Sequence, residues 1–475
     1  MSAVRRIARE EWRLMRRDRV AMLGLTLLLL LGSVAAFTAW DQRRAADAER
    51  QEHQAQVDHE FDAQPDRHPH RMVHYGHFVF RPLNALAAFD AGIDPFTGHT
   101  LFLEGHRQNS ANFGDVRQSS LLMRFGQLTP AFVLQVLAPL LLVFIGHAAV
   151  ARERESGLLR VLMAQGLRPG QLVAGKLLAL AGVGALMLLP PAVALAAIAL
   201  DQPATAPLTL AIALAYAAWL ALWALGVALV STLARRGRDA LMALLAVWTV
   251  SVVLLPRLAP ELAAAAQPLP TRLETDIAVA RDLAALGDSH NPDDPYFSEF
   301  RRKVLARYGV SRVEDLPVNY KGLVGMEGER LTSELFERYG RQSFARQQAQ
   351  LQQVTMFSAL SPVIALRRLS MGAAGTDLTH NQRFLDQAER HRYAMVQALN
   401  RMQAEKLSWS GDRNSRDSRI SKDHWHGLAA FHFDAEPPAA TLRRIAPMAA
   451  ALAAWLLALA AALAWATGRL RGAMR

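Results

Sequence analysis

The hydrophobic residues of this chain gather in six long runs that contain no Lys, Arg, Asp or Glu. A helix rises about 1.5 Å per residue, so about 20 apolar residues cross the roughly 30 Å hydrocarbon layer of a membrane. The fifth run is the shortest of the six. We therefore predict an all-α polytopic membrane protein whose six transmembrane helices cover residues 20–40, 129–150, 177–200, 208–233, 240–256 and 445–467.

Two long polar blocks, residues 41–128 and 257–444, separate these runs. The first block begins with many helix-forming residues and has no Gly or Pro before Pro65, which predicts a polar stalk that continues the first span. In the second block apolar residues recur at helical spacing, which predicts several helices, a long one over residues 329–356 among them. Together the two insertions predict a largely helical extracytoplasmic domain.

The net charge of +11 is concentrated in four short segments beside the spans, where basic residues outnumber acidic ones. These segments are residues 1–19, 151–176, 234–239 and 468–475. Because Lys and Arg accumulate in cytoplasmic loops, the pattern places all four segments and both termini in the cytoplasm, and we assign the chain to the bacterial inner membrane. Membrane topology accounts for the basic excess, so the charge does not indicate a nucleic-acid partner.

Two of the basic segments contain residues expected at the membrane interface. Residues 1–19 read as an amphipathic elbow helix, with Trp12 and Arg16 at the lipid surface. The letters G-x-x-x-x-G-K, from Gly170 to Lys176, are those of a phosphate-binding loop, but Leu177 follows where a Ser or Thr is needed and no strand precedes them. We therefore expect Lys176 to extend to the lipid headgroups.

The candidate chemistry outside the spans is limited. The chain has no Cys, which excludes disulfides and thiolate ligands. Neutral imidazoles as dense as His68, His70, His74 and His77 can bind zinc or copper(II), but their spacing matches no metal-site pattern, so we predict no metal and keep these four as candidates. Ser370, Asp377 and His380 invite a hydrolase interpretation, yet triad members usually come from separate elements, and Asp377 is better explained as a helix N-cap.

The segment between the second and third spans, ERESGLLRVLMAQGLRPGQLVAGKLLA, carries a family resemblance. It resembles the coupling region of type-2 ABC transporter permeases, the type V exporter fold. The matching positions are Glu155, Gly157, Leu158, Leu162, Leu172, Gly175 and Lys176. The large segments after the first and fifth spans are similar to a subfamily related to permeases involved in multi-copper enzyme maturation.

This resemblance implies a transporter subunit that is not an enzyme and binds no cofactor itself. A separate ABC ATPase would bind ATP and Mg, a second permease, identical or a paralogue, would complete the pathway, and a periplasmic protein is a further partner. The chain would be an exporter permease that moves a substrate or exerts force on that periplasmic partner. A helix over residues 154–165 would contact the ATPase through Arg154, Glu155, Gly157, Leu158, Leu162 and Gln165. A metal-handling or cuproenzyme-maturation membrane factor that uses the histidine-rich segment is the alternative function.

Overall fold

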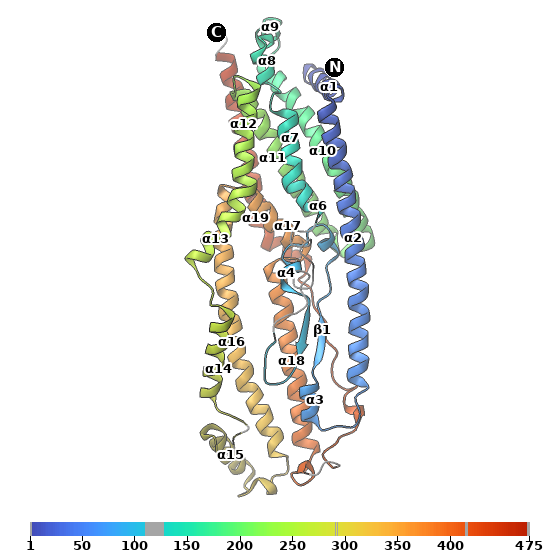
Figure 1. The fold of residues 1–475 in the computed structure, drawn as a ribbon, viewed down its shortest axis with the longest axis vertical. Coiled ribbons are helices and arrows are strands. Elements are labelled where there is room, and N and C mark those ends of the chain that lie inside the picture. Colours follow the sequence, from blue (N-terminus) through green and yellow to red (C-terminus); the bar gives the residue numbers. More distant parts are fainter. Residues whose placement is uncertain (1, 110–127, 290, 292, 414–416, 473–475) are drawn as a thin grey trace.

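The computed structural model describes residues 2–109, 128–289, 291, 293–413 and 417–472, which form an elongated, mainly helical molecule (Figure 1). Both termini lie at one end, here called the terminal end. Within the described residues, 6 helices are long and apolar enough to cross a membrane. They run over Arg19–Asp62, Pro130–Glu155, Pro169–Asp201, Pro203–Leu233, Gly237–Ala266 and Pro438–Leu470. The prediction of an all-α polytopic membrane protein is confirmed, and each predicted span overlaps one of these helices, in order.

The chain enters the membrane region through a sharp turn at Asp18. Helix α1 (Ala3–Arg17) ends there, and the Asp18 carboxylate accepts the backbone N–H groups of Val20 and Ala21 at the start of α2 (Arg19–Asp62). Such side-chain capping satisfies donors that a helix start leaves unpaired. Helix α2 is 44 residues long, because the polar residues after the first span are good helix formers. The predicted polar stalk is confirmed.

The other spans pack around one central helix, α11 (Ala206–Leu233), which buries Tyr216, Trp219 and Trp223. Two spans contain a π-helical turn, at Val133–Leu137 and Thr249–Leu254. The elements that form the remaining spans are α6 (Pro130–Phe132), α7 (Ala138–Gly146), α8 (Ala151–Glu155), α10 (Pro169–Asp201), α12 (Gly237–Trp248), α13 (Leu255–Ala266) and α19 (Pro438–Gly472). Between α8 and α10 lies the short helix α9 (Leu158–Ala164).

The half of the molecule away from the termini, here called the distal domain, combines helices with one small hairpin. Strands β1 (His77–Phe80) and β2 (Thr100–Leu103) pair antiparallel, with His77 opposite Leu103. The helices are α3 (Pro69–Tyr75), α4 (Asp94–Thr97), α14 (Arg272–Leu286), α15 (Pro295–Tyr308), α16 (Tyr320–Met356), α17 (Pro362–Ala374) and α18 (Leu378–Lys406). Short 3₁₀ turns lie here at Ala85–Ala88, Val313–Asp315, Phe357–Ala359, Gly411–Arg413 and Lys422–His424, and a further one, Pro203–Thr205, precedes α11 among the spans. A hairpin alone is only marginally stable, and this one shares a hydrophobic core with α3 and α18.

Helix α17 joins the distal domain to the spans. Val363, Leu366 and Leu369 are buried in the same hydrophobic core as α11 and α19. Its apolar sequence is too short to cross a membrane, and it packs across the distal ends of the spans instead. The distal domain is therefore packed onto the membrane helices as well as linked to them by the chain.

Candidate functional site

The predicted contact helix over residues 154–165 is interrupted in the structure. Helix α8 ends at Glu155 and α9 begins at Leu158, with Gly157 between them at φ 76°. The left-handed region costs an ordinary L-residue more than it costs glycine. A single continuous helix was therefore the wrong expectation, because Gly157 turns the chain after α8. A Cβ atom at Gly157 would meet nothing within 4 Å, so backbone conformation and not crowding calls for glycine here.

Helix α9 presents an apolar surface at the terminal end of the molecule. Leu158 is 44% and Val161 51% exposed, whereas Leu159 is 5% exposed and packs with Val150 and Leu172. Leu162 is half-buried, and the predicted contact residue Gln165 ends the helix. Val161 was not among the predicted contact residues. The face of a seven-residue helix that points outward depends on which of its leucines is buried, and in α9 the buried one is Leu159.

The charged residues Arg154 and Glu155 bind the neighbouring loop of the chain. Arg154 donates to the carbonyl oxygens of Leu233 and Ala234, at 3.1 and 2.9 Å, where α11 ends. The Glu155 carboxylate accepts the backbone N–H of Gly237 at 3.1 Å, where α12 begins. A cation at a helix C-terminus and an anion at an N-terminus both complement the helix dipole. These two side chains therefore tie α8 to the fourth and fifth spans.

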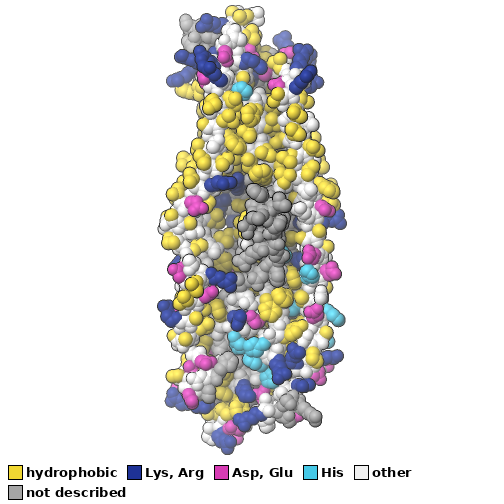
Figure 2. Space-filling model, in the orientation of Figure 1, with side chains coloured by type: hydrophobic (Ala, Val, Ile, Leu, Met, Phe, Trp, Pro, Cys, Tyr) yellow, Lys and Arg dark blue, Asp and Glu magenta, His cyan; other side chains and the backbone are white. Residues whose placement is uncertain are grey.

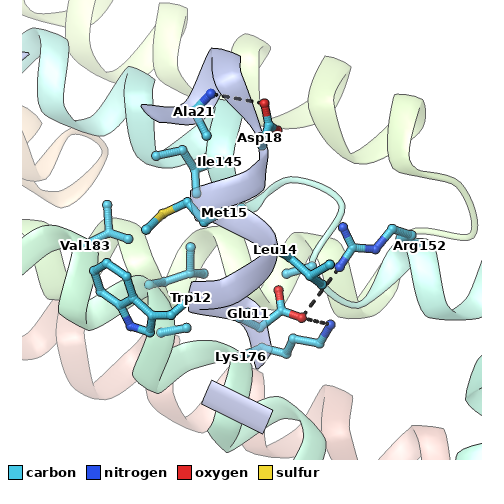
Figure 3. A pocket seen from close by; sticks show the side chains of 14 residues that line it. Glu11, Trp12, Leu14, Met15, Asp18, Ala21, Ile145, Arg152, Lys176 and Val183 are labelled. Carbon is cyan, nitrogen blue, oxygen red and sulfur yellow. Dashed lines mark hydrogen bonds and ion pairs between the residues drawn. The ribbon is translucent and has the colours of Figure 1, made fainter. Parts of the chain in front are cut away.

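Lys176 lies in a buried ion-pair cluster (Figure 3). Its Nζ is 2.6 Å from Glu11 Oε1 and 2.6 Å from Glu153 Oε1, and its side chain is 2% exposed. Arg152 Nη2 lies 3.5 Å from Glu11 Oε1, so the cluster contains two cations and two carboxylates. The expectation that Lys176 reaches the lipid headgroups was wrong, because α1 lies over α10 and supplies a carboxylate. The cluster connects α1, α8 and α10.

The elbow helix α1 fits closely against α10. A Cβ at Gly175 would lie 2.6 Å from Ile7 Cβ and 3.0 Å from the Val4 carbonyl oxygen. The indole of Trp12 packs on Gly182 and is partly buried, while Arg16 is exposed. The interface prediction for Trp12 therefore misses its contact with the third span. Gly170 and Gly175 both lie inside α10, so the G-x-x-x-x-G-K segment is helical and does not form a phosphate-binding loop.

Substituting Gly175 by valine is expected to displace α1 from α10, because the nearest atoms, Ile7 Cβ and the Val4 carbonyl oxygen, cannot move away by rotation of a side chain. Trypsin should then cleave the arginine-rich α1 at least several-fold faster in nanodiscs. Gly226→Val is the matched control, since a Cβ at Gly226 in α11 meets nothing within 4 Å. Equal cleavage rates for Gly175→Val and the control would contradict the close packing of α1.

A second polar cluster lies where α17 meets the spans. Ser370 Oγ donates to the Asp90 carboxylate and lies 3.1 Å from Tyr216 Oη, which accepts a hydrogen bond from Gln135 at 2.7 Å. Arg367 donates to Gln135 Oε1 at 3.0 Å. Burial raises the pKa of Asp90, against the effect of its hydrogen bonds from Ser370 and the Gly92 backbone. The cluster links the distal domain to the second and fourth spans.

This arrangement also overturns the hydrolase interpretation. Asp377 caps α18, accepting the His380 backbone N–H at 3.1 Å, and its carboxylate lies 2.7 Å from His380 Nδ1. Ser370 instead bonds to Asp90 and Tyr216. The N-cap prediction for Asp377 is confirmed, and the three residues do not assemble as a triad.

The four predicted metal candidates do not gather at one point. His68 Nε2 lies 2.5 Å from Asp412, and His77 Nε2 lies 2.8 Å from Asp58. Of these four, His70 and His74 are the pair whose ring nitrogens meet, with their Nε2 atoms 3.2 Å apart. The third imidazole beside them is that of His106, which follows β2. His106 was not among the four candidates, because only the pairing of β1 with β2 brings this downstream histidine back to α3.

Two family models match this chain. A family model described as ABC-2 family transporter protein matches residues 5–302. The chain belongs to this family. A second model, a domain of unknown function (DUF3526), matches residues 272–434. No curated protein matches the chain.

The ABC-2 match covers the elbow helix, the first five spans and the beginning of the second polar block, while the domain of unknown function covers α14 to α18. The protein is thus a transmembrane subunit of an ABC transporter, and this family membership implies an ATPase partner. The relation to multi-copper enzyme maturation stays a prediction.

Proposed function

We propose that this ABC-2 family protein is an exporter permease of the bacterial inner membrane, with both termini in the cytoplasm. Separate ATPase subunits bind ATP and Mg, and a second permease, identical or a paralogue, completes the pathway. The distribution of charge supports this orientation: Lys and Arg side chains gather at the terminal end, beside a broad apolar band (Figure 2). The distal domain then lies outside the cytoplasm.

The exposed apolar pair Leu158 and Val161 is the observation that supports this proposal best. Both residues project from a short helix at the terminal end, where an ATPase reaches the permease. Exposed apolar side chains on a charged surface favour burial by a partner, at about 1.5–3 kcal/mol for a fully buried Leu or Val. In this proposal the ATPase binds α9 and buries Leu158 and Val161.

The contacts around α9 offer a route by which its movement reaches the spans. Helix α8 is tied to α11 and α12 by Arg154 and Glu155, and to α1 and α10 by the Lys176 cluster. In the N-terminal half of α11, Tyr216 contacts Ser370 of the distal domain. A rigid-body movement started by ATP-driven closure would therefore be passed to the substrate pathway or to a periplasmic partner.

The test is the double substitution Leu158→Glu with Val161→Glu, studied with an ABC ATPase that co-purifies with this chain. Loss of two apolar contacts is expected to weaken the association at least tenfold and to remove the stimulation of ATPase activity in nanodiscs. Leu273→Glu is the control, since Leu273 is 68% exposed but lies on α14 in the distal domain. Unchanged association and stimulation in the double variant would show that α9 is not the coupling element.

A further inference from the structure

Three histidines from two separate elements meet on the surface of the distal domain. One ring nitrogen each of His70, His74 and His106 lies within 4.8 Å of the others. The ring centroids are 4.7 Å apart for His70 and His74, 5.3 Å for His74 and His106, and 5.7 Å for His70 and His106. Figure 2 shows histidine side chains gathered in this half of the molecule. His74 is exposed and the other two are half-buried, so the group is open to solvent.

The backbone holds these histidines in place. His70 and His74 are four residues apart in α3, which puts them on the same face of the helix. His68 begins this helix and its Nδ1 accepts the backbone N–H of His70 at 3.0 Å. The turn after β2 is bonded to α3 directly, because Gly105 donates to the Val73 carbonyl oxygen at 3.1 Å. The next residue, His106, is thereby placed beside the other two imidazoles.

The conformation of His106 is unusual. Its φ is 66°, and among the described residues it is the one non-glycine with a positive φ. Residues held in this region cluster at functional sites, where surrounding contacts maintain them. Here the Glu329 carboxylate accepts the His106 backbone N–H at 3.0 Å and lies 3.7 Å from its Nδ1. Glu329 is itself fully buried and paired with Arg392 at 2.6 Å.

We propose that His70, His74 and His106 bind a divalent zinc or copper ion. Imidazole nitrogens suit both metals, and three histidines leave a coordination position for water or a further ligand. Two nitrogens bound to one tetrahedral zinc at about 2.05 Å are about 3.3 Å apart, and the Nε2 atoms of His70 and His74 are 3.2 Å apart. An N–H···N hydrogen bond gives a similar distance for two imidazoles, but it does not account for a third, strained histidine beside them.

Glu329 has the position of an outer-shell carboxylate. A metal-bound histidine usually presents its other ring nitrogen to a carboxylate or carbonyl, which orients the ring and raises its basicity. Glu329 Oε2 lies 3.7 Å from Nδ1 of His106, so the proposal assigns the other ring nitrogen, Nε2, to the metal. Glu329 is therefore a positioning residue of this site.

The proposal is tested on the full chain in nanodiscs after removal of metals with a chelator. Titration with Zn²⁺ and with Cu²⁺, each alone and against a competing chelator, is expected to show one tight equivalent for at least one ion. His74→Gln and His106→Asn should each lower the affinity at least 100-fold. Asn tolerates the left-handed backbone of His106, so this variant removes the imidazole without forcing the turn to change.

Matched controls separate the site from other histidines. His426→Gln replaces an exposed histidine outside the group and should leave the affinity unchanged.

Glu329→Gln should weaken metal binding 10- to 100-fold, as substitutions of outer-shell residues do. In the Cu²⁺ form, nitrogen hyperfine structure in the electron paramagnetic resonance spectrum should be lost in the double variant His74→Gln with His106→Asn. Unchanged stoichiometry and affinity in that double variant would overturn the proposal. The outcome does not depend on how the chain contacts its ATPase.

Discussion

Replacing Lys176 by methionine is expected to destabilise the terminal end of the molecule by about 3–5 kcal/mol, the usual cost of breaking a buried ion pair by removing one partner. Glu153 would stay buried without the ammonium that lies 2.6 Å from it, and Glu11 would lose the contact that holds α1 against α10. Arg152 is half-exposed and 3.8 Å from Glu153, so it compensates only in part. The apparent melting temperature in nanodiscs and the rate of trypsin cleavage in α1 measure the effect.

Charge-matched variants separate the ion pair from the packing of the long side chain. Lys176→Arg keeps the positive charge and should lose much less stability than Lys176→Met. Adding Glu153→Gln and Glu11→Gln to Lys176→Met removes the unpaired carboxylates, and should restore part of the loss. If Lys176→Met alone melted like the unsubstituted protein, the buried cluster would not contribute to stability.

Replacing Arg392 by methionine is expected to destabilise the distal domain by at least about 3–5 kcal/mol, because one substitution leaves two buried carboxylates unpaired. The Arg392 side chain is 1% exposed and pairs with Glu329 at 2.6 Å and Glu389 at 2.8 Å. It also donates to Ser333 Oγ and to the Glu104 carbonyl oxygen, at 2.7 and 3.0 Å. Arg392 thus joins α16 and α18 to the turn after β2.

The electrostatics of Arg392 explain the size of this effect. Burial opposes its charged form, but the carboxylates of Glu389 and Glu329 outweigh burial and raise the pKa of Arg392. Burial raises the pKa of Glu389, against the effect of Arg392. Without the guanidinium, each carboxylate must become protonated or draw in water, and both responses cost free energy.

Hydrogen exchange of the α16 and α18 backbone amides measures the loss in the distal domain. Protection is expected to fall along both helices in Arg392→Met. Arg390→Met is the control. Arg390 is exposed on the same helix, and its side chain donates to the backbone carbonyl oxygen of Asp386, one turn earlier in α18. Its loss should change the free energy of unfolding by no more than about 0.5 kcal/mol. Equal protection in the two variants would contradict the central role of the buried ion pairs of Arg392 with Glu329 and Glu389.

Much of the fold could be predicted because it depends on local composition. The six spans follow from the length of apolar runs, since a helix in lipid must satisfy its backbone internally and expose apolar side chains. The stalk after Trp40 and the N-cap at Asp377 follow from helix formers and capping chemistry within a few residues. The hairpin of β1 and β2 escaped prediction, because its short strands are stabilised by helices distant in the sequence.

The sequence by itself determined the membrane class, the order of the spans and the position of the segment between the second and third spans, because each depends on neighbouring residues. Only the tertiary structure decided which charged and polar groups meet. Lys176 and Glu11 are 165 positions apart, His106 and Glu329 are 223 apart, and Ser370 and Asp90 are 280 apart. A buried charge is stable only beside a partner, and helix packing and strand pairing decide where that partner lies.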